Sequence, residues 1–360
     1  MDRLFRLLII NPGSTSTKIA VFENEKKVFE NTIGHSIEEM QKFEDIIDQF
    51  EYRKELILKE LKDNSIELST MSAVVGRGGG IAPCAGGTYI VDENVVEDLK
   101  IGVSGQHASN LGGIIADDIA KQYNINAYIV DPVVVDELEP VSRITGLPFM
   151  KRVSRFHALN QKAVARYAAA ECGKKYEEAN IVVVHAGGGI SVGAHHTGRV
   201  IDVTDAYYGD GPFSPDRCGA LPSGEVVEMC FSGKYSKKEI MGMLIKSGGL
   251  MSHTGTGDVR EIVSRIENGD EYAELVYNAM IYQVAKAIGS YAVVLKGKVD
   301  AIVLTGGIAY EKRFVGTIEE MTGFIAPVRV YPGEFEMEAL AQGGLRVLRG
   351  EEAAKIYKDK

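Results

Sequence analysis

Cysteines are few in this 360-residue chain, basic residues are outnumbered by acidic ones, and no long apolar run occurs. None of the four cysteines belongs to a C-x-x-C pair, so neither a zinc site nor a disulfide framework is indicated. The formal net charge of -10 argues against a nucleic-acid-binding surface. A membrane-spanning helix needs about 20 apolar residues, which no segment offers, and residues 1–6 lack a signal-peptide core. We therefore expect a cytoplasmic protein that binds neither nucleic acid nor membrane.

Glycine, in contrast, is abundant at 40 residues and gathers in loops that follow apolar strands. The first such loop lies between two strands: residues 7–10 predict a buried strand, residues 11–18 a polar turn and residues 19–22 a return strand. The turn carries Asn11, Gly13, Ser14, Thr15, Ser16 and Lys18. Such a turn offers backbone N–H groups, hydroxyls and a cation to one spot, as a phosphate requires. Because a strand follows, it is not a Walker A loop, and taken alone it could equally be an ordinary hairpin.

The same plan returns further along the chain. Residues 181–184 predict a strand, His185–Gly189 a glycine-rich turn and 190–194 a return strand. Each half then has a second glycine loop after a short apolar strand, at residues 76–80 and 305–307. Four such loops in matching order imply two similar α/β domains. We expect a first domain over 1–150 and a second over 151–336, with a helix at about 337–360 returning to the first.

In the segments between these loops, apolar residues recur at helical spacing. A capping box at Ser36–Glu39 opens one long helix or two up to about residue 63. Further helices are expected at 92–100, 106–123, from 158 onward, 237–246, 271–295 and 336–347. His195 and His196 stand just before an expected turn, so we expect both at the surface.

The duplicated plan of hairpins and glycine loops resembles the superfamily that contains actin, sugar kinases and the heat-shock chaperone ATPase domains. Within it, the whole chain is similar to the acetate and butyrate kinases. Asn11–Lys18 resembles the first phosphate motif of that family, His185–Gly189 the second, and Leu304–Ile308 the adenosine motif. The resemblance implies an α/β fold of two duplicated actin-like (ribonuclease H-like) domains, each with a mixed central sheet, and an active-site cleft between the domains.

The resemblance also implies which residues form the site. Phe156-His157 matches the pair that supplies the active-site histidine, and Arg77 and Arg217 match the two active-site arginines. Asp131 and Glu336 fall where the family places its metal-side carboxylates, with Glu338 close enough to leave that choice open. The implied phosphate-binding residues are Asn11, Gly13, Ser14, Thr15, Ser16, Lys18, His185, Gly187, Gly188 and Gly189. The implied nucleotide-binding residues are Gly306, Gly307 and Ile308.

Three departures from the acetate enzymes point to the butyrate branch of the family. Ala158 replaces a glycine, Gly188 replaces an asparagine, and Arg77 stands directly among glycines. The implied reaction transfers the γ-phosphoryl group of ATP, with Mg²⁺, to butyrate or a branched short-chain acid. The products are an acyl phosphate and ADP, and the transfer is direct, in-line and reversible. The implied partners are the nucleotide, the acid and further copies of the chain in a homo-oligomer.

This chemistry accounts for the residue types. A carboxylate titrates at about 4 and is already ionised at neutral pH, so it needs no general base. Joining it to a phosphoryl group instead requires positive charge and alignment, which arginines and a metal supply. His157 would donate a hydrogen bond to the phosphoryl group, while His185 could serve packing as readily as contact.

Three alternatives remain at this point. The first is an acetate or propionate kinase of the same family. A sugar kinase of the same fold needs a carboxylate base, for which Asp205, Asp210 or Asp216 could serve. A filament or chaperone ATPase shares the fold but leaves the two arginines unexplained.

Overall fold

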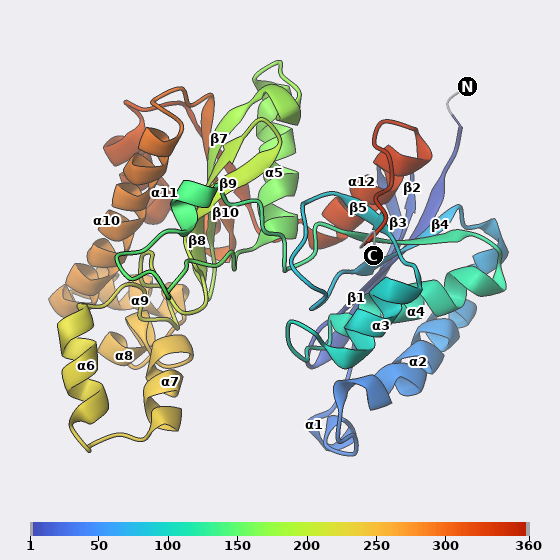
Figure 1. Ribbon diagram of the computed structural model, residues 1–360, viewed down its shortest axis with the longest axis horizontal. Coiled ribbons are helices and arrows are strands. Elements are labelled where there is room, and N and C mark those ends of the chain that lie inside the picture. The colour runs from blue at the N-terminus through green and yellow to red at the C-terminus, as the bar shows by residue number, and fades with distance from the viewer. Residues whose placement is uncertain (1–2, 358–360) are drawn as a thin grey trace. The chain divides into compact units, whose positions relative to one another are not determined.

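The computed structural model describes residues 3–357, which form two compact units (Figure 1). The first unit runs up to Val135 and resumes at Phe335, and the second is Asp136–Glu334. The sequence placed the corresponding boundaries at residues 150 and 336.

A mixed six-stranded sheet forms the first unit. Its strands are β1 (Arg6–Pro12), β2 (Ser16–Glu23), β3 (Lys26–Gly34), β4 (Ala73–Arg77), β5 (Thr88–Ile90) and β6 (Asn126–Val130). They lie in the order β3-β2-β1-β4-β6-β5. The hairpin strands β1, β2 and β3 are antiparallel, whereas β1 pairs with β4 and β4 with β6 in parallel. The first phosphate motif is therefore the β1–β2 turn, as the sequence predicted.

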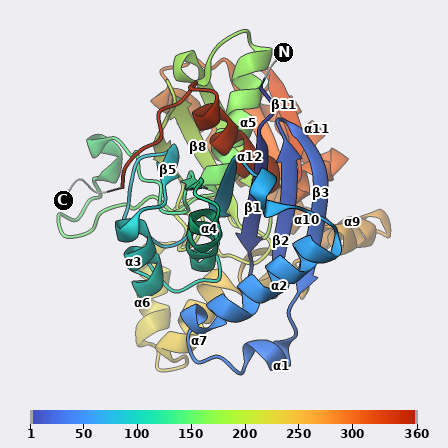
Figure 2. The same ribbon diagram turned by 90° about the vertical axis from the view of Figure 1, so that its right-hand side faces the viewer.

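Helices cover both faces of this sheet. They are α1 (Ile37–Met40), α2 (Phe50–Asp63), α3 (Glu93–Ile101), α4 (Asn110–Gln122) and α12 (Glu336–Leu348). The helices α2, α3 and α4 share an apolar core with the sheet, through residues such as Ile57, Leu99 and Leu111 (Figure 2). The opposite face meets α12, where Gly344 lies so close to Leu7 and Val75 that a side chain would not fit. The helical segment predicted over 36–63 divides into α1, a 3₁₀ helix (Ile46–Gln49) and α2.

The second unit repeats the sheet of the first. Its strands are β7 (Asn180–Ala186), β8 (Ile190–His196), β9 (Arg199–Val203), β10 (Ala301–Gly306) and β11 (Val328–Pro332). Their order is β11-β10-β7-β8-β9, with β7, β8 and β9 antiparallel and β10 and β11 added in parallel. Read from the hairpin, this is the order and direction of β1, β2, β3, β4 and β6. The duplication predicted from the sequence is confirmed.

Helices also flank the second sheet. They are α5 (Ala158–Glu171), α6 (Ser223–Phe231), α7 (Lys237–Ile245), α8 (Gly249–Thr254), α9 (Val259–Glu267), α10 (Glu271–Val294) and α11 (Lys312–Thr322). The core on one face gathers around α10 and α11 through Tyr277 and Phe314, and α5 packs on β7 and β10 from the other. No helix in the described part of the chain is both long and apolar enough to cross a membrane.

Candidate active site

The first phosphate turn projects its polar groups from the end of β1 and the start of β2. Asn11 is 6% exposed, whereas Ser14 and Thr15 at the tip are exposed. The Gly13 N–H donates to the Ser16 carbonyl at 2.7 Å and closes the turn. Asn11 and Lys18 are cross-strand partners in an antiparallel pair, so their side chains share one face of the sheet.

A buried arginine that the sequence analysis did not identify supports this turn from below. Arg53 on α2 is 1% exposed, and its guanidinium donates to the Gly13 carbonyl at 3.0 Å and to Thr17 Oγ1 at 2.9 Å. It also donates twice to Gln49 Oε1, at 2.9 and 3.0 Å. Arg53 therefore supports the turn through its carbonyl groups.

Asn11, Arg77 and Glu336 form one cluster in the first unit. Glu336 Oε2 accepts from an Arg77 guanidinium nitrogen at 2.5 Å and from Asn11 Nδ2 at 2.8 Å. Arg77 also lies 3.3 Å from Asn11 Oδ1. Glu338 instead pairs with Lys27 at 3.0 Å. Of the two carboxylates, Glu336 is therefore the one that the fold places beside the residues of the first phosphate motif.

Asp131 lies at the end of β6 in a left-handed conformation, with φ of 37°. It is 2% exposed, its Oδ1 accepts the Gly87 N–H at 2.7 Å, and its own N–H donates to the Gly87 carbonyl at 2.9 Å. In this structure Asp131 therefore holds the loop that precedes β5.

His107, just before α4, is a second residue that the sequence analysis missed. Its ring Nδ1 lies 2.9 Å from Ser109 Oγ. Burial lowers the pKa of His107, and the charges of Arg77 and Arg53 lower it further. A lone histidine in a loop belongs to no motif, so only the fold shows that His107 lies near Arg77 and Arg53.

In the second unit, the two predicted histidines lie against each other. The His157 and His185 rings are stacked, with centroids 3.7 Å apart and planes 10° from parallel. His157 occupies the N-cap position of α5, and His185 lies near the end of β7, where it is 3% exposed. His185 Nδ1 lies 2.8 Å from Asn160 Oδ1. The structure thus shows the packing role left open for His185, at a point where its ring also borders His157.

Arg217 lies directly against the second phosphate turn. A side chain at Gly189 would overlap the Arg217 guanidinium, so only glycine leaves room for this contact. The guanidinium donates to the Ala206 carbonyl and lies over the Tyr207 ring, 5.4 Å from its centroid. Burial lowers the pKa of Arg217, although the charge remains at neutral pH. Burial also raises the pKa of Asp216, against the opposing effect of Arg217.

A cavity of about 710 Å³ adjoins this turn. Its wall includes Gly187 and Gly188 of the phosphate motif and Gly307 and Ile308 of the adenosine motif. The two motifs lie together because Gly306, with φ of 89°, packs against the Ala186 backbone with no space for a side chain. The remaining wall, which the motifs did not predict, is formed by Pro215, Asp216, Gly257, Asp258, Val259, Arg260, Val263, Tyr310 and Glu311. A partly apolar cavity beside a glycine turn suits a base and its phosphates.

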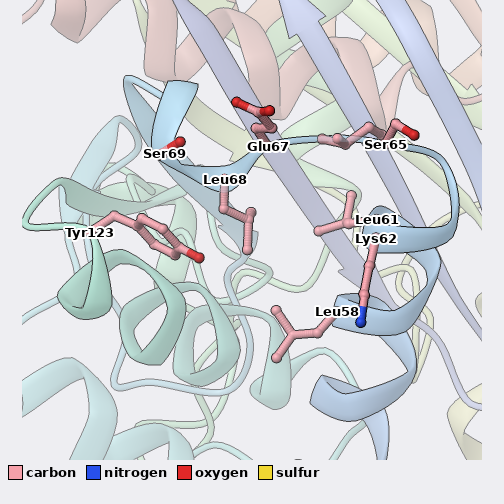
Figure 3. Close-up of a pocket in the computed structure, with 9 residues that line it drawn as sticks. Leu58, Leu61, Lys62, Ser65, Glu67, Leu68, Ser69 and Tyr123 are labelled. Atoms are coloured by element: carbon pink, nitrogen blue, oxygen red, sulfur yellow. The ribbon is translucent and has the colours of Figure 1, made fainter.

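The first unit has a separate hollow of about 610 Å³. Figure 3 shows its wall, with Leu58 and Leu61 on α2, Leu68 on the facing segment and Tyr123 at the end of α4. None of the predicted site residues lines it.

Two α/β units of one design, with glycine turns at corresponding strand ends and a nucleotide-sized cavity, are the architecture of the actin-like class of proteins. The acetokinase family model matches residues 149–322. Butyrate kinase 1 of Clostridium acetobutylicum is 57% identical over 99% of this chain and 100% of its own length. Among solved structures, acetate kinase of Porphyromonas gingivalis has a TM-score of 0.77 at 20% identity, covering 96% of this chain and 100% of its own. A propionate kinase of Francisella tularensis has a TM-score of 0.71 at 20% identity, covering 94% of this chain and 98% of its own.

The chain belongs to the acetokinase family, and its predicted resemblance to the butyrate kinases is confirmed. It is an enzyme, a carboxylate kinase, and membership implies that it uses ATP and ADP. The two solved structures bear out the actin-like fold. The sugar-kinase and filament alternatives are thereby set aside.

Proposed function

We propose that this enzyme transfers the γ-phosphoryl group of ATP to butyrate, giving butyryl phosphate and ADP, and that it also runs in reverse. The observation that carries the proposal is the 57% identity, over nearly the full chain, to a protein named butyrate kinase. The residues of the second unit support it, because the Arg217 guanidinium and the stacked imidazoles of His157 and His185 lie at the glycine turn that forms part of the cavity wall.

The roles follow from charge. Butyrate enters as an anion, so no residue has to remove a proton, and the cost lies in bringing it to the phosphoryl group. Arg217 presents a planar fork that would neutralise charge on the migrating phosphoryl oxygens. His157 would donate a hydrogen bond to the same group, and Arg77 would hold the carboxylate.

The donor set of the first unit fits Mg²⁺. Among residues 3–357 there is no group of three or more histidine, cysteine or acidic side chains that could hold a metal. Mg²⁺ bound to ATP needs less than this, because phosphates and water supply most of its ligands. Glu336 would hold it, directly or through water, and Asn11 Oδ1 would support it. When bound, the ion neutralises phosphate charge. For Asp131 the metal role stays a prediction.

A substrate panel tests the proposal. We expect kcat/KM for butyrate to exceed that for acetate by roughly tenfold, because each buried CH₂ contributes about 0.8 kcal/mol. Acetate, propionate, butyrate and isobutyrate would be compared, with the acyl phosphate trapped by hydroxylamine. Acetate as clearly the best substrate would contradict the proposal.

The His157→Ala variant tests the absence of a base. It should lower kcat more than it raises KM for the acid, and its rate should not recover at alkaline pH. Recovery at high pH would show that the wild-type enzyme removes a proton. The homo-oligomer, the cytoplasmic location and the cleft between domains stay predictions of the sequence.

A further inference from the structure

Behind His157 lies a chain of buried polar side chains that the reaction itself does not require. His157 and Gln161 are one helical turn apart on α5, and Ser191 and His195 lie on the same face of β8. Ser191, Gln161 and His195 are all 0% exposed. Polar groups this deep must pair with one another, so the direction of each hydrogen bond can be worked out in turn.

The assignment of hydrogen-bond directions begins at Gln161. Its Nε2 lies 3.1 Å from the Ser191 carbonyl oxygen, which can only accept, so the amide nitrogen must face Ser191. The same Nε2 donates to Ser191 Oγ at 2.7 Å. The amide oxygen is thereby directed at His195 Nε2, 3.0 Å away, and that nitrogen must carry a hydrogen.

The far end of the chain agrees with this assignment. Tyr176 OH lies 2.8 Å from His195 Nδ1, to which it can donate only if that nitrogen is unprotonated. Burial lowers the pKa of His195 well below its usual range, and the charges of Lys162 and Arg166 act in the same direction. His195 is therefore neutral, with its hydrogen on Nε2, and it fixes the orientation of Gln161.

The near end sets the state of His157. Ser191 Oγ already accepts from Gln161, and its single hydrogen points to the other group in reach, His157 Nδ1 at 2.9 Å. A nitrogen that accepts carries no hydrogen, so the hydrogen of the neutral His157 ring is on Nε2. The His185 stack fixes the plane of the ring, and Ser191 fixes its rotation in that plane.

We propose that Ser191 and Gln161 are positioning residues that hold His157 as the Nε2–H tautomer, ready to donate to the phosphoryl group. The proposal rests on the proposed function only where it says that His157 donates to the phosphoryl group. The tautomer itself follows from the hydrogen-bond order and can be measured without substrate. Loss of the hydrogen-bond partner of a metal-binding histidine typically costs about 10- to 100-fold in metal affinity or activity, and we expect a loss of this order for His157.

The test combines nitrogen NMR with kinetics on the full chain. With ¹⁵N-labelled histidine at a pH where His157 is neutral, the wild-type ring should show an unprotonated Nδ1 and a protonated Nε2. The His157→Gln variant assigns the signals by removing them. A wild-type Nδ1–H tautomer would overturn the proposal outright, whatever acid proves to be the substrate.

Ser191→Ala should yield a mixture of tautomers and lower kcat about 10- to 100-fold, with KM for the acid nearly unchanged. Ser191→Thr, which restores the hydroxyl, should restore both the single tautomer and the wild-type kcat. Gln161→Met provides a second test, because it releases the Ser191 hydroxyl without touching His157. The matched control is Ser290→Ala on α10, which removes only a hydroxyl bonded to its own helix. A folded Ser191→Ala variant with wild-type kcat would refute the positioning role.

Discussion

Arg53→Met tests whether the first phosphate turn depends on the buried guanidinium beneath it. Methionine keeps much of the length and the apolar stem of arginine but removes every donor. The Ser16 carbonyl would retain the Gly13 N–H at 2.7 Å. The Gly13 carbonyl and Gln49 Oε1, which now accept at 3.0 and 2.9 Å, would each lose a donor.

A buried acceptor left without a donor costs about 1–3 kcal/mol, so two of them cost about 2–6 kcal/mol. Removing the guanidinium also removes the cost of burying its charge, and this offsets part of the loss. Arg53 is 1% exposed, and this burial of its charge also lowers its pKa. We therefore expect the turn to be destabilised by about 2–4 kcal/mol and kcat/KM for ATP to fall.

Amide hydrogen exchange is the appropriate assay, because two compact units need not unfold in one transition. Protection should fall at residues 13–17 and on α2, while β7 to β11 stay unchanged. Lys59→Met is the matched control, since Lys59 lies on the same helix and is exposed. It should change stability by less than about 0.5 kcal/mol. Arg53→Lys should recover little, because one ammonium cannot replace the fork. Wild-type exchange and kinetics in Arg53→Met would refute the reasoning.

Three further predictions follow from the same contacts. Arg217→Ala should lower turnover by about 10³–10⁵-fold, and Arg217→Lys should recover little; full turnover with lysine would contradict the role of the fork. Asn11→Ala should lower kcat by about tenfold or more with the fold intact, as judged by circular dichroism and steady-state rates. Burial, aided by the Arg53 charge, lowers the pKa of His35 to about 4. The unfolded chain therefore binds this proton from about pH 6.5 downward and the folded chain only near 4, so stability falls as pH drops through that window, by up to about 3 kcal/mol. Denaturant unfolding at pH 7 and 4.5 should show this loss in the wild type and a smaller one in His35→Asn.

The architecture was predictable because it is repeated. A buried strand, a glycine-rich turn and a return strand occur twice in the same order, and the observed orders β3-β2-β1-β4-β6 and β9-β8-β7-β10-β11 match element for element. The motifs therefore contain Gly187, Gly188, Gly307 and Ile308, which line one cavity in the structure. The residues from the intervening loop and α9 that complete its wall, such as Asp258 and Arg260, have no repeat and gave no such signal.

Arg53 could not be predicted for a different reason. A single arginine on an amphipathic helix is normally solvated, and acidic residues near it in the sequence favour that reading. Its partners in the phosphate turn lie about 40 positions earlier in the chain. Only the packing of α2 on the sheet makes them neighbours, so local sequence patterns carry no trace of the contact.

The position of His195 shows where alternation along a strand misleads. We expected it at the surface, and this was wrong, because it is 0% exposed, while the neighbouring His196 is exposed. On β8 one face carries apolar residues and the other carries Ser191, Gly193 and His195. Period-two alternation assigns such a polar face to water. Here α5 covers it, and a side chain at Gly193 would meet Gln161 Oε1 at 2.9 Å. A polar strand face is thus a solvent face only if no helix packs on it, and when one does, each polar residue needs a partner on that helix. Gln161, one turn after His157, is the partner for both Ser191 and His195. Because Ser191 in turn contacts His157, the position of His157 is set by residues that no motif contains.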